Sequence, residues 1–219
     1  MQEDETFNER TVYCEDALSW LSAQGVIPGC SMITSLPDFS EFPHLSLEEW
    51  KAWFIQAALL VMNSCPDEGV SIFYQTDIKK EGVWVDKGFL CQLAGVQSGS
   101  HLLWHKIVCR TQPGNTSYGR PAYAHLLCFS RKNRADISKS TADVLPETGE
   151  ITWTRGMGKE VCLAACQFVL ENSTTQTIVD PFCGHGTVLA VANELGMKAI
   201  GVELGRKRAK KARLLRFQV

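Results

Sequence analysis

The residues best suited to chemistry lie in a glycine-rich turn near the end of the sequence, residues 180–186, which read DPFCGHG. An apolar run, residues 177–179, precedes the turn, and apolar-periodic residues typical of a helix follow from Thr187. Glycines at 184 and 186 lack a Cβ atom, so a ligand and the backbone can approach closely there. A helix that begins at Thr187 would point its free N–H groups and positive dipole end at such a ligand.

A second apolar strand, residues 199–202, ends at an acid, Glu203, which is placed to accept hydrogen bonds from ribose hydroxyls. A strand, a glycine turn, a helix and a strand with a terminal acid form a βαβ half that binds an adenosine-containing ligand. Leu189 stands where a dinucleotide fingerprint has its third glycine, which argues against NAD. The sequence also lacks the Gly-Lys-Ser/Thr of a nucleoside-triphosphate loop.

A second turn, Ser-Leu-Pro-Asp at residues 35–38, lies where an apolar strand ends. Asp38 adds a carboxylate that can act as a proton acceptor. The alternative is that Asp38 only caps the turn that follows it. The sequence leaves both roles open.

The pattern Asp-Pro-Phe-x-Gly-x-Gly-Thr, followed by Gly-Val-Glu-Leu, resembles motifs I and II of the S-adenosylmethionine-dependent methyltransferases. The closest form is that of the permuted, β-type amino-methyltransferases of nucleic acids, whose motif I lies near the end of the chain. This resemblance implies S-adenosylmethionine as the cofactor. The implied cofactor-binding residues are Asp180, Pro181, Phe182, Gly184, Gly186, Thr187 and Glu203, with Asp16 at the adenine amine and Gly156 and Lys159 at the methionine end. Asp16 is also suited to be the N-cap of a helix.

The same resemblance makes residues 35–38 the catalytic motif, which in the family is Asp, Asn or Ser, then two prolines, then an aromatic residue. Ser35 and Pro37 match, whereas Leu36 replaces the first proline and Asp38 replaces the aromatic residue. In the family, the polar side chain and a turn carbonyl accept the two N–H bonds of an exocyclic base amine, and the aromatic residue stacks on the flipped base. Ser35 and the Leu36 carbonyl can still accept, but stacking requires Phe39 or Phe42. The departure leaves open whether the reaction is simple amine methylation.

The elements that must position these turns alternate in type along the chain. Seven strands are predicted, at residues 10–14, 31–35, 70–75, 102–109, 123–129, 177–180 and 199–203, with helices that include 47–63, 87–93 and 160–170. The resemblance places the last two strands in the middle of the sheet, beside the first two. We therefore expect a circularly permuted, Rossmann-like class I α/β fold whose mostly parallel sheet has an antiparallel edge pair.

Length and composition bound the remaining possibilities. The 219 residues fit a single methyltransferase domain, with residues 1–9 expected to be disordered and 131–150 expected to form a mobile loop. No apolar run approaches the roughly 20 residues that span a bilayer, so no membrane association is expected. Nine cysteines without a Cys-x-x-Cys pair indicate reduced thiols and an intracellular location, cytoplasmic or nuclear. Cys162 and Cys166 stand one helical turn apart, but no second ligand pair has zinc-site spacing, so no metal site is predicted.

Charge and length also bear on the substrate. The formal net charge is −2, yet residues 206–216 are rich in Lys and Arg, which suits either phosphate contacts or a solvated helix face. We expect methylation of a nucleic acid base, in RNA (including tRNA) rather than DNA, because no stretch suggests a target-recognition domain. A homodimer or a partner subunit could supply the substrate recognition that a target-recognition domain would otherwise provide. The alternatives are a protein or small-molecule methyltransferase, and a catalytically silent cofactor-binding subunit of a methyltransferase complex.

Overall fold

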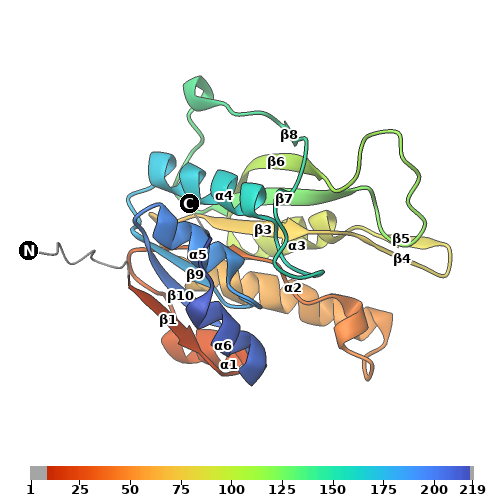
Figure 1. The fold of residues 1–219 in the computed structure, drawn as a ribbon, viewed down its shortest axis with the longest axis horizontal. Coiled ribbons are helices and arrows are strands. Elements are labelled where there is room, and N and C mark those ends of the chain that lie inside the picture. Colours follow the sequence, from red (N-terminus) through yellow and green to blue (C-terminus); the bar gives the residue numbers. More distant parts are fainter. Residues whose placement is uncertain (1–8, 218–219) are drawn as a thin grey trace, which may run out of the picture.

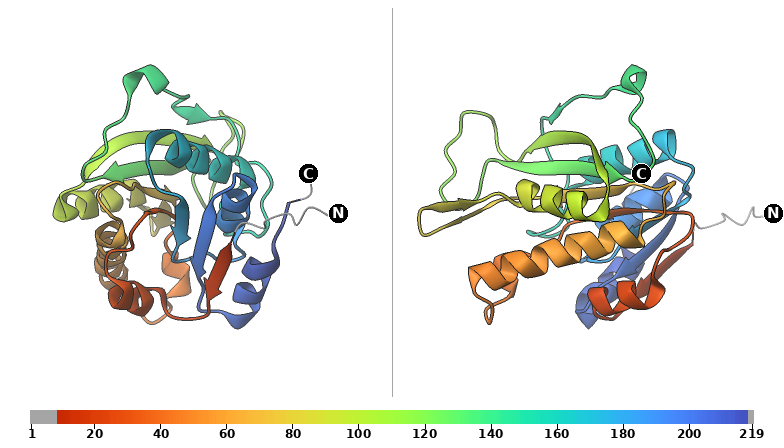
Figure 2. Two further views of the ribbon diagram at one scale, coloured as in Figure 1. Left: turned by 90° about the vertical axis from the view of Figure 1, so that its left-hand side faces the viewer. Right: turned by 180° about the vertical axis from the view of Figure 1, so that it is seen from behind.

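A mixed eight-stranded sheet runs through the protein, with helices packed on both faces (Figures 1 and 2). The structure is a computed structural model and describes residues 9–217. Across the sheet the strands are β1 (Arg10–Tyr13), β10 (Lys198–Val202), β9 (Thr177–Asp180), β2 (Cys30–Thr34), β3 (Ser71–Gln75), β7 (Tyr123–Ser130), β6 (His101–Cys109) and β8 (Val144–Leu145).

The strand order confirms the predicted circular permutation. β1, β10, β9, β2 and β3 are parallel neighbours, so the two C-terminal strands lie between the two N-terminal ones. β7 runs antiparallel to both β3 and β6, which gives the predicted antiparallel pair. The parallel arrangement brings the carboxyl ends of β2, β3, β9 and β10 to one edge of the sheet, where ligands bind in open α/β sheets.

Two apolar layers hold the helices on the sheet. The helices α1 (Ala17–Gln24), α2 (Leu47–Ser64) and α3 (Lys87–Ser98) contribute side chains to one layer. The opposite layer contains side chains of α4 (Lys159–Asn172), α5 (Thr187–Glu194) and α6 (Arg206–Leu214). Both faces of the central parallel strands β2, β3 and β9 are therefore mostly buried, whereas β1 at the edge of the sheet is partly exposed.

Helix α2 shows how the local sequence sets an element. Ser46 accepts the backbone N–H of Glu49 and Glu49 accepts the N–H of Ser46, so the predicted capping box is confirmed. Trp50, Phe54 and Val61 then recur at helical spacing and are fully buried against the sheet. Replacing Phe54 by alanine would cost about 3–5 kcal/mol, the usual penalty for an aromatic core truncation.

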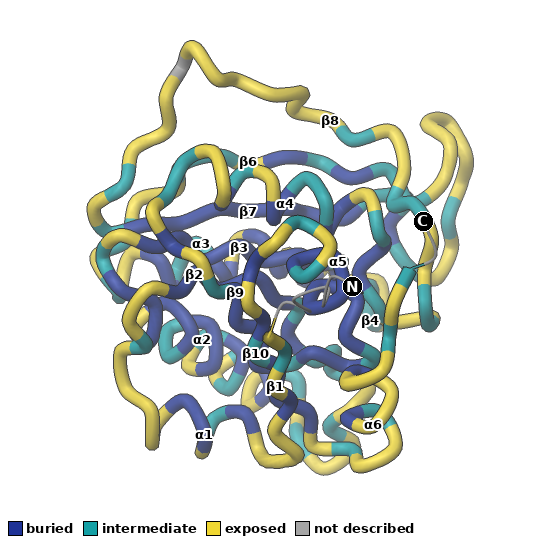
Figure 3. Tube along the Cα trace, turned by 60° about the vertical axis from the view of Figure 1, so that its left-hand side comes forward, coloured by how far each residue is buried: buried dark blue, intermediate teal, exposed yellow. Residues whose placement is uncertain are grey.

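The segment 131–150, predicted as a mobile surface loop, has regular structure in two places. This segment contains a 3₁₀ turn (Ile137–Lys139) and the short strand β8, which pairs with β6 and makes the sheet eight-stranded rather than seven-stranded. The ammonium group of Lys106 fixes it by donating to the carbonyls of Thr141 and Ala142. Figure 3 shows the stretch between β7 and β8 as an exposed arm that returns to the sheet at β8.

Two further findings complete the fold. A two-stranded hairpin, β4 (Ile78–Lys80) and β5 (Val83–Val85), follows β3 and was not predicted. The disorder expected at residues 1–9 concerns a stretch that, except for Glu9, lies outside the described residues. Within residues 9–217, no helix combines the length and the apolar character needed to cross a membrane.

Candidate functional site

A cavity of about 360 Å³ lies at the carboxyl ends of the central parallel strands. The glycine turn after β9 and the acid after β10 line one part of it, and the turn after β2 lines another. The two turns singled out in the sequence, which lie far apart along the chain, therefore face a common space. Of the predicted cofactor-binding residues, those that line the cavity are Asp16, Gly156, Asp180, Pro181, Phe182, Gly184, Thr187 and Glu203.

Glu203 is held in a fixed orientation at the end of β10. Its Oε1 atom accepts from Nε of Arg208 at 2.8 Å and from the backbone N–H of Gly205 at 2.6 Å. Its side chain is 8% exposed. Both of these donors bind the same oxygen, which leaves the Oε2 atom available to a ligand hydroxyl. Arg208 was missed at the level of sequence because nothing in a basic helix marks which cation turns back to the site.

Asp180 lies deeper, at the end of β9. Its Oδ1 atom accepts the hydroxyl of Thr34 at 2.7 Å and the backbone N–H of Phe182 at 3.1 Å. Burial raises the pKa of Asp180 to about 7, although these two hydrogen bonds act in the opposite direction. This carboxyl therefore braces the glycine turn against β2, and its charge depends on pH near neutrality.

The two glycines of the turn serve different purposes. Gly184 has φ +54°, and a Cβ atom there would approach the ring of Trp153, whose indole stacks on His185 at a centroid distance of 5.0 Å. Gly186 has φ +84°, and a Cβ atom there would lie 2.8 Å from the backbone of Ala212 in α6. Gly186 does not line the cavity. The packing of α6 is enough to require this glycine, and its assignment as a cofactor contact stays a prediction.

Lys159 also lies away from the cavity lining. It begins α4, where its Nζ atom is 3.6 Å from a carboxylate oxygen of Glu194 and 4.5 Å from the ring centroid of Phe217. The assignment of Lys159 to the methionine end is thus not supported by its position, whereas Gly156 in the preceding loop does line the cavity. Asp16 caps α1 by accepting the N–H of Ser19 at 2.8 Å, and it lines the cavity, while its contact with an adenine amine stays a prediction.

All four residues of the Ser35–Leu36–Pro37–Asp38 turn line the cavity. Asp38, however, is already engaged: its Oδ2 atom lies 2.9 Å from Nζ of Lys87 and 3.7 Å from Arg120, and its Oδ1 atom accepts the N–H of Ser40. Burial would raise the pKa of Asp38, but Lys87, the N–H of Ser40 and Arg120 outweigh burial and lower it. A carboxylate in this state is a weak proton acceptor.

Lys87 is the principal residue that sequence reasoning missed. It is the first residue of α3, its side chain is only 3% exposed, and it lines the cavity beside Asp38. Burial lowers the pKa of Lys87, with the charge and hydrogen bond of Asp38 acting in the opposite direction. The linear sequence offered no signal, because the two partners are 49 positions apart and a lysine at a helix start is ordinary.

Aromatic side chains also face the cavity. Phe42 and Trp53 pack with centroids 4.4 Å apart, and Trp53 lies 6.3 Å from Phe182, all three lining the space. Phe39 instead packs edge-on against Trp50 in the core, so it does not supply a stacking surface. Of the two aromatic residues considered for a stacking role, only Phe42 is placed for it.

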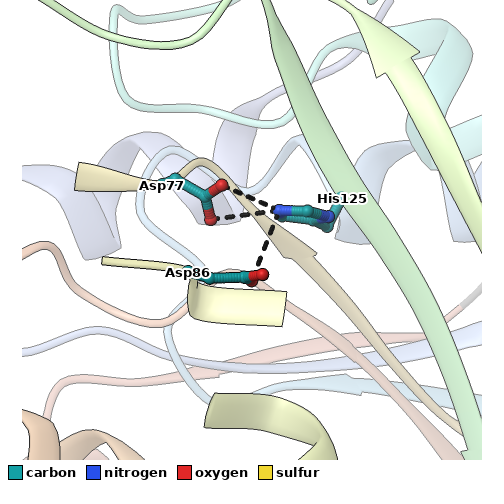
Figure 4. Close-up of side chains that lie close together, drawn as sticks. All are labelled: Asp77, Asp86 and His125. Atoms are coloured by element: carbon teal, nitrogen blue, oxygen red, sulfur yellow. Dashed lines mark hydrogen bonds and ion pairs between the residues drawn. The ribbon is translucent and has the colours of Figure 1, made fainter. Parts of the chain in front are cut away.

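One group of side chains beside the cavity has the spacing of metal ligands (Figure 4): Asp77 after β3, Asp86 before α3 and His125 on β7. Both oxygens of Asp77 lie 3.0 Å from Nε2 of His125, and Asp77 also accepts the N–H of Lys87 and the indole N–H of Trp84. Asp86 is the N-cap of α3, and its side chain accepts the backbone N–H of Phe89 in the first turn of that helix. These oxygens are already satisfied by protein donors, so the group fits a brace that fixes the start of α3. The pair Cys162 and Cys166 is buried in the apolar core.

Comparison with known proteins agrees with this geometry. Residues 164–213, which hold most of α4 and all of α5 and β10, match the family model of N6/N4 methyltransferases described as DNA methylase. No curated protein sequence matches the chain.

Solved structures match along nearly the whole chain. TTHA0409 of Thermus thermophilus, provisionally named a DNA modification methylase and crystallised in complex with S-adenosyl-L-methionine, is 16% identical with a TM-score of 0.71, over 94% of this chain and 92% of that one. PvuII DNA methyltransferase, cytosine-N4-specific, is 17% identical with a TM-score of 0.73, over 98% and 89%. The M1.HpyAVI–SAM complex is 13% identical with a TM-score of 0.63, over 94% and 98%.

This chain has the fold of the permuted S-adenosylmethionine-dependent methyltransferases. The predicted fold class and resemblance are therefore confirmed. In this methyltransferase fold, the glycine turn, Glu203 and the Ser35–Asp38 turn lie together at the predicted edge of the sheet. The RNA preference gains no support, because the matched family and the PvuII enzyme are described as acting on DNA.

Proposed function

We propose that this protein is an S-adenosylmethionine-dependent methyltransferase that acts on an exocyclic amine of a nucleic acid base. The observation that carries the proposal is the shared cavity. It brings the glycine turn of residues 180–186 and Glu203 to the same space as the Ser35–Asp38 turn. A methyltransferase needs this juxtaposition of a cofactor site and an acceptor site, because methyl transfer from a sulfonium is an in-line displacement.

The residues present fit the cofactor. The oriented carboxylate of Glu203 suits two ribose hydroxyls, and Asp16 at the cavity wall suits an adenine amine. Gly184 allows close approach of the backbone, and the N-terminus of α5 at Thr187 faces the cavity. When bound, S-adenosylmethionine would supply an electrophilic methyl group. The protein's part is to align the two reactants and to exclude water.

The acceptor role falls to the turn after β2. The hydroxyl oxygen of Ser35 and the carbonyl oxygen of Leu36 would accept the N–H bonds of the base amine, which draws its lone pair out of the ring. Phe42 and Trp53 offer an aromatic wall for the base, in place of the aromatic residue absent at position 38. Asp38 would act by holding the turn through Lys87 rather than by accepting a proton.

The kind of nucleic acid is the finer part of the proposal. The preference for RNA derives from the sequence, in which no stretch suggests a target-recognition domain. The comparisons point to DNA instead. Exposed basic side chains on α6 suit the phosphates of either polymer (Arg206, Lys207, Lys210 and Lys211).

A catalytically silent subunit remains a second candidate because of one observation. The catalytic motif lacks its first proline and its aromatic residue, and Asp38 is neutralised by Lys87. Such a subunit would bind the cofactor and support a partner enzyme without transferring a methyl group itself.

The decisive experiment incubates the protein and methyl-tritiated cofactor with cell extract, divided into portions treated with RNase, DNase or protease. We expect label in nucleic acid, lost with one nuclease and kept with protease. Ser35→Ala should reduce the rate about 10- to 100-fold, the loss of one hydrogen bond to a group that develops charge. Label that survives both nucleases would refute a nucleic acid substrate. Cofactor binding without any transfer would favour the silent subunit.

A further inference from the structure

The β4–β5 hairpin and the loop of residues 110–122 project together beyond the carboxyl ends of the parallel strands. Figures 1 and 2 show the two segments side by side, extending away from the sheet. Lys79 of the hairpin joins them, because its Nζ atom donates to the carbonyl of Ser117 at 3.0 Å. Lys80 pairs with Val83, so only two residues form the turn of the hairpin. We call the exposed surface of residues 78–85 and 110–122 the rim surface.

The rim surface is attached to the acceptor turn at two points. Nζ of Lys80 lies 4.3 Å from the ring centroid of Phe39, the residue that follows Asp38. From the other segment, Arg120 lies 3.7 Å from Oδ2 of Asp38, and Arg120 also lines the cavity. A molecule that lies on the rim surface would therefore continue directly into the cavity beside the acceptor turn.

Two large aromatic side chains of the rim surface face solvent. Tyr118 is 91% exposed and Trp84 is 47% exposed, and neither lines the cavity. The indole of Trp84 is held in place, because its Nε1 atom donates to Oδ2 of the buried Asp77 at 2.9 Å. Nζ of Lys79 lies 4.6 Å from the centroid of the same ring. Trp84 is thus an aromatic plane of fixed orientation that remains open to a ligand.

The charge of the rim surface differs in sign from that of the whole chain. Its segments carry four cations and one acid, whereas the chain has a formal net charge of −2. The one acid, Glu81, lies 3.9 Å from Nζ of Lys80 and is itself mostly exposed. The four cations are Lys79, Lys80, Arg110 and Arg120. The excess of positive charge favours an anionic partner.

Aromatic planes interspersed with cations suit one kind of partner better than others. In a single-stranded nucleic acid, the faces of the bases can stack on aromatic rings while the phosphates contact the cations. A duplex covers the faces of its bases, so it cannot use Trp84 and Tyr118 in this way. The core of a protein–protein interface is depleted of charged residues, which does not fit the cations that border these rings.

We propose that the rim surface binds an unpaired stretch of nucleic acid, with bases stacked on Trp84 and Tyr118 and phosphates held by Lys79 and Arg120. The inference rests on the proposed function, because the strand on the rim is taken to carry the base that enters the cavity. It deepens that function by naming the partner as single-stranded and by placing its contact surface outside the cavity.

The test measures strand binding with probes that contain no base amine. Fluorescence anisotropy follows the binding of three probes to the full chain saturated with S-adenosylhomocysteine. The probes are a thymidine dodecamer, an abasic dodecamer with the same phosphates, and the duplex of the thymidine dodecamer with its complement. Because thymine has no amine to methylate, the affinity for the first probe does not depend on the chemistry of the cavity.

The variants are chosen in matched pairs. Tyr118→Leu removes the ring at a fully exposed position, and Tyr118→Phe keeps it. Trp84→Leu and Trp84→Phe both lose the hydrogen bond to Asp77, so the presence of a ring is what separates them. Lys79→Gln removes a cation of the rim, and Lys198→Gln removes an exposed cation at the amino end of β10, at the opposite edge of the sheet.

We expect the thymidine dodecamer to bind at least about tenfold more tightly than the abasic strand or the duplex. Each leucine variant should lower its affinity about 5- to 100-fold relative to the matched phenylalanine variant, as expected for the loss of one stacked base. Lys79→Gln should lower the log–log salt slope by about 0.7, the value for one phosphate of a single strand, and Lys198→Gln should leave the slope unchanged.

Equal affinities for the thymidine and abasic strands, or a duplex that binds as tightly, would overturn the inference. So would Tyr118→Leu that binds like Tyr118→Phe, since a side chain that is 91% exposed can be replaced without loss of the fold. The proposed function fails separately: strand binding that depends on these rings, without methyl transfer to any nucleic acid, would contradict that function and leave the rim surface supported.

Discussion

The buried pair of Asp38 and Lys87 allows a quantitative test of whether Asp38 has a structural or a chemical role. We consider Asp38→Asn, Lys87→Met and the double variant. In Asp38→Asn, the ammonium group of Lys87, 3% exposed, loses its carboxylate partner. Removing one partner of a buried pair costs about 3–5 kcal/mol, and the 17% exposure of Asp38 places this case near 3 kcal/mol.

Lys87→Met should cost less, about 1–2 kcal/mol, because the charge of Asp38 keeps other support. Arg120 lies 3.7 Å from Asp38, and the N–H of Ser40 still donates to it. In the double variant neither charge is left alone, so its cost should be close to that of Lys87→Met. The two single costs should therefore fail to add by about 3 kcal/mol.

The assay is guanidinium unfolding of the wild type and the three variants, with the affinity for S-adenosylhomocysteine as a check on the site. If Asp38 holds the turn, the double variant should also keep methyl transfer within about tenfold of the wild type. Additive costs would contradict the ion-pair reasoning. A double variant that is stable yet inactive, together with an active Lys87→Met, would show that Asp38 takes part in the chemistry.

Other contacts of the site and its surroundings can be tested in the same way. Gly186→Ala, which places a Cβ atom against α6 at φ +84°, should lower the free energy of unfolding by about 2–4 kcal/mol. The control Gly196→Ala, at φ +81° with open space around it, should lower it by only about 1 kcal/mol. Equal losses would refute the packing role. Burial raises the pKa of Asp180 to about 7, so the folded protein keeps a proton that the unfolded carboxyl releases near pH 4. The free energy of unfolding should therefore fall by up to about 4 kcal/mol as the pH rises from about 4 to 7. Asp180→Asn, measured across the same range, should flatten this slope. Lys207→Glu with Lys210→Glu on α6 should reduce the salt dependence of nucleic acid binding by about one unit of log–log slope per lost phosphate contact, and an unchanged slope would exclude α6 from the interface.

The parts of the fold that the sequence predicted are those set by local pattern. The apolar runs of β9 and β10, the periodicity of α5 and the capping box of α2 appear where they were expected. β8 and the β4–β5 hairpin were missed because strands of two or three residues carry no measurable alternation. β8 exists because Lys106 and the backbone of Ile107 bind its approach segment, which is a tertiary effect.

The site divides in the same way. Gly184 and Gly186 have one sequence signature, and only the structure shows that the first borders the cavity and the second borders α6. Lys87 and Arg208 were not recognised because the carboxylate that each one pairs with is brought near only by folding. A sequence motif identifies residues whose function depends on the local backbone. Pairs of side chains that are far apart in the sequence can be identified only from their positions in the structure.

The cavity at the sheet edge is central to the proposed function, because it would hold the methyl donor and a base amine together. The most direct measurement is mass spectrometry of nucleosides from RNA and DNA incubated with the protein and methyl-deuterated S-adenosylmethionine, with Ser35→Ala in parallel. We predict the deuterated methyl group on N4 of cytosine or N6 of adenine, at a rate that falls in Ser35→Ala. A deuterated methyl group on a ring carbon, on a ribose hydroxyl or only on protein would contradict this function.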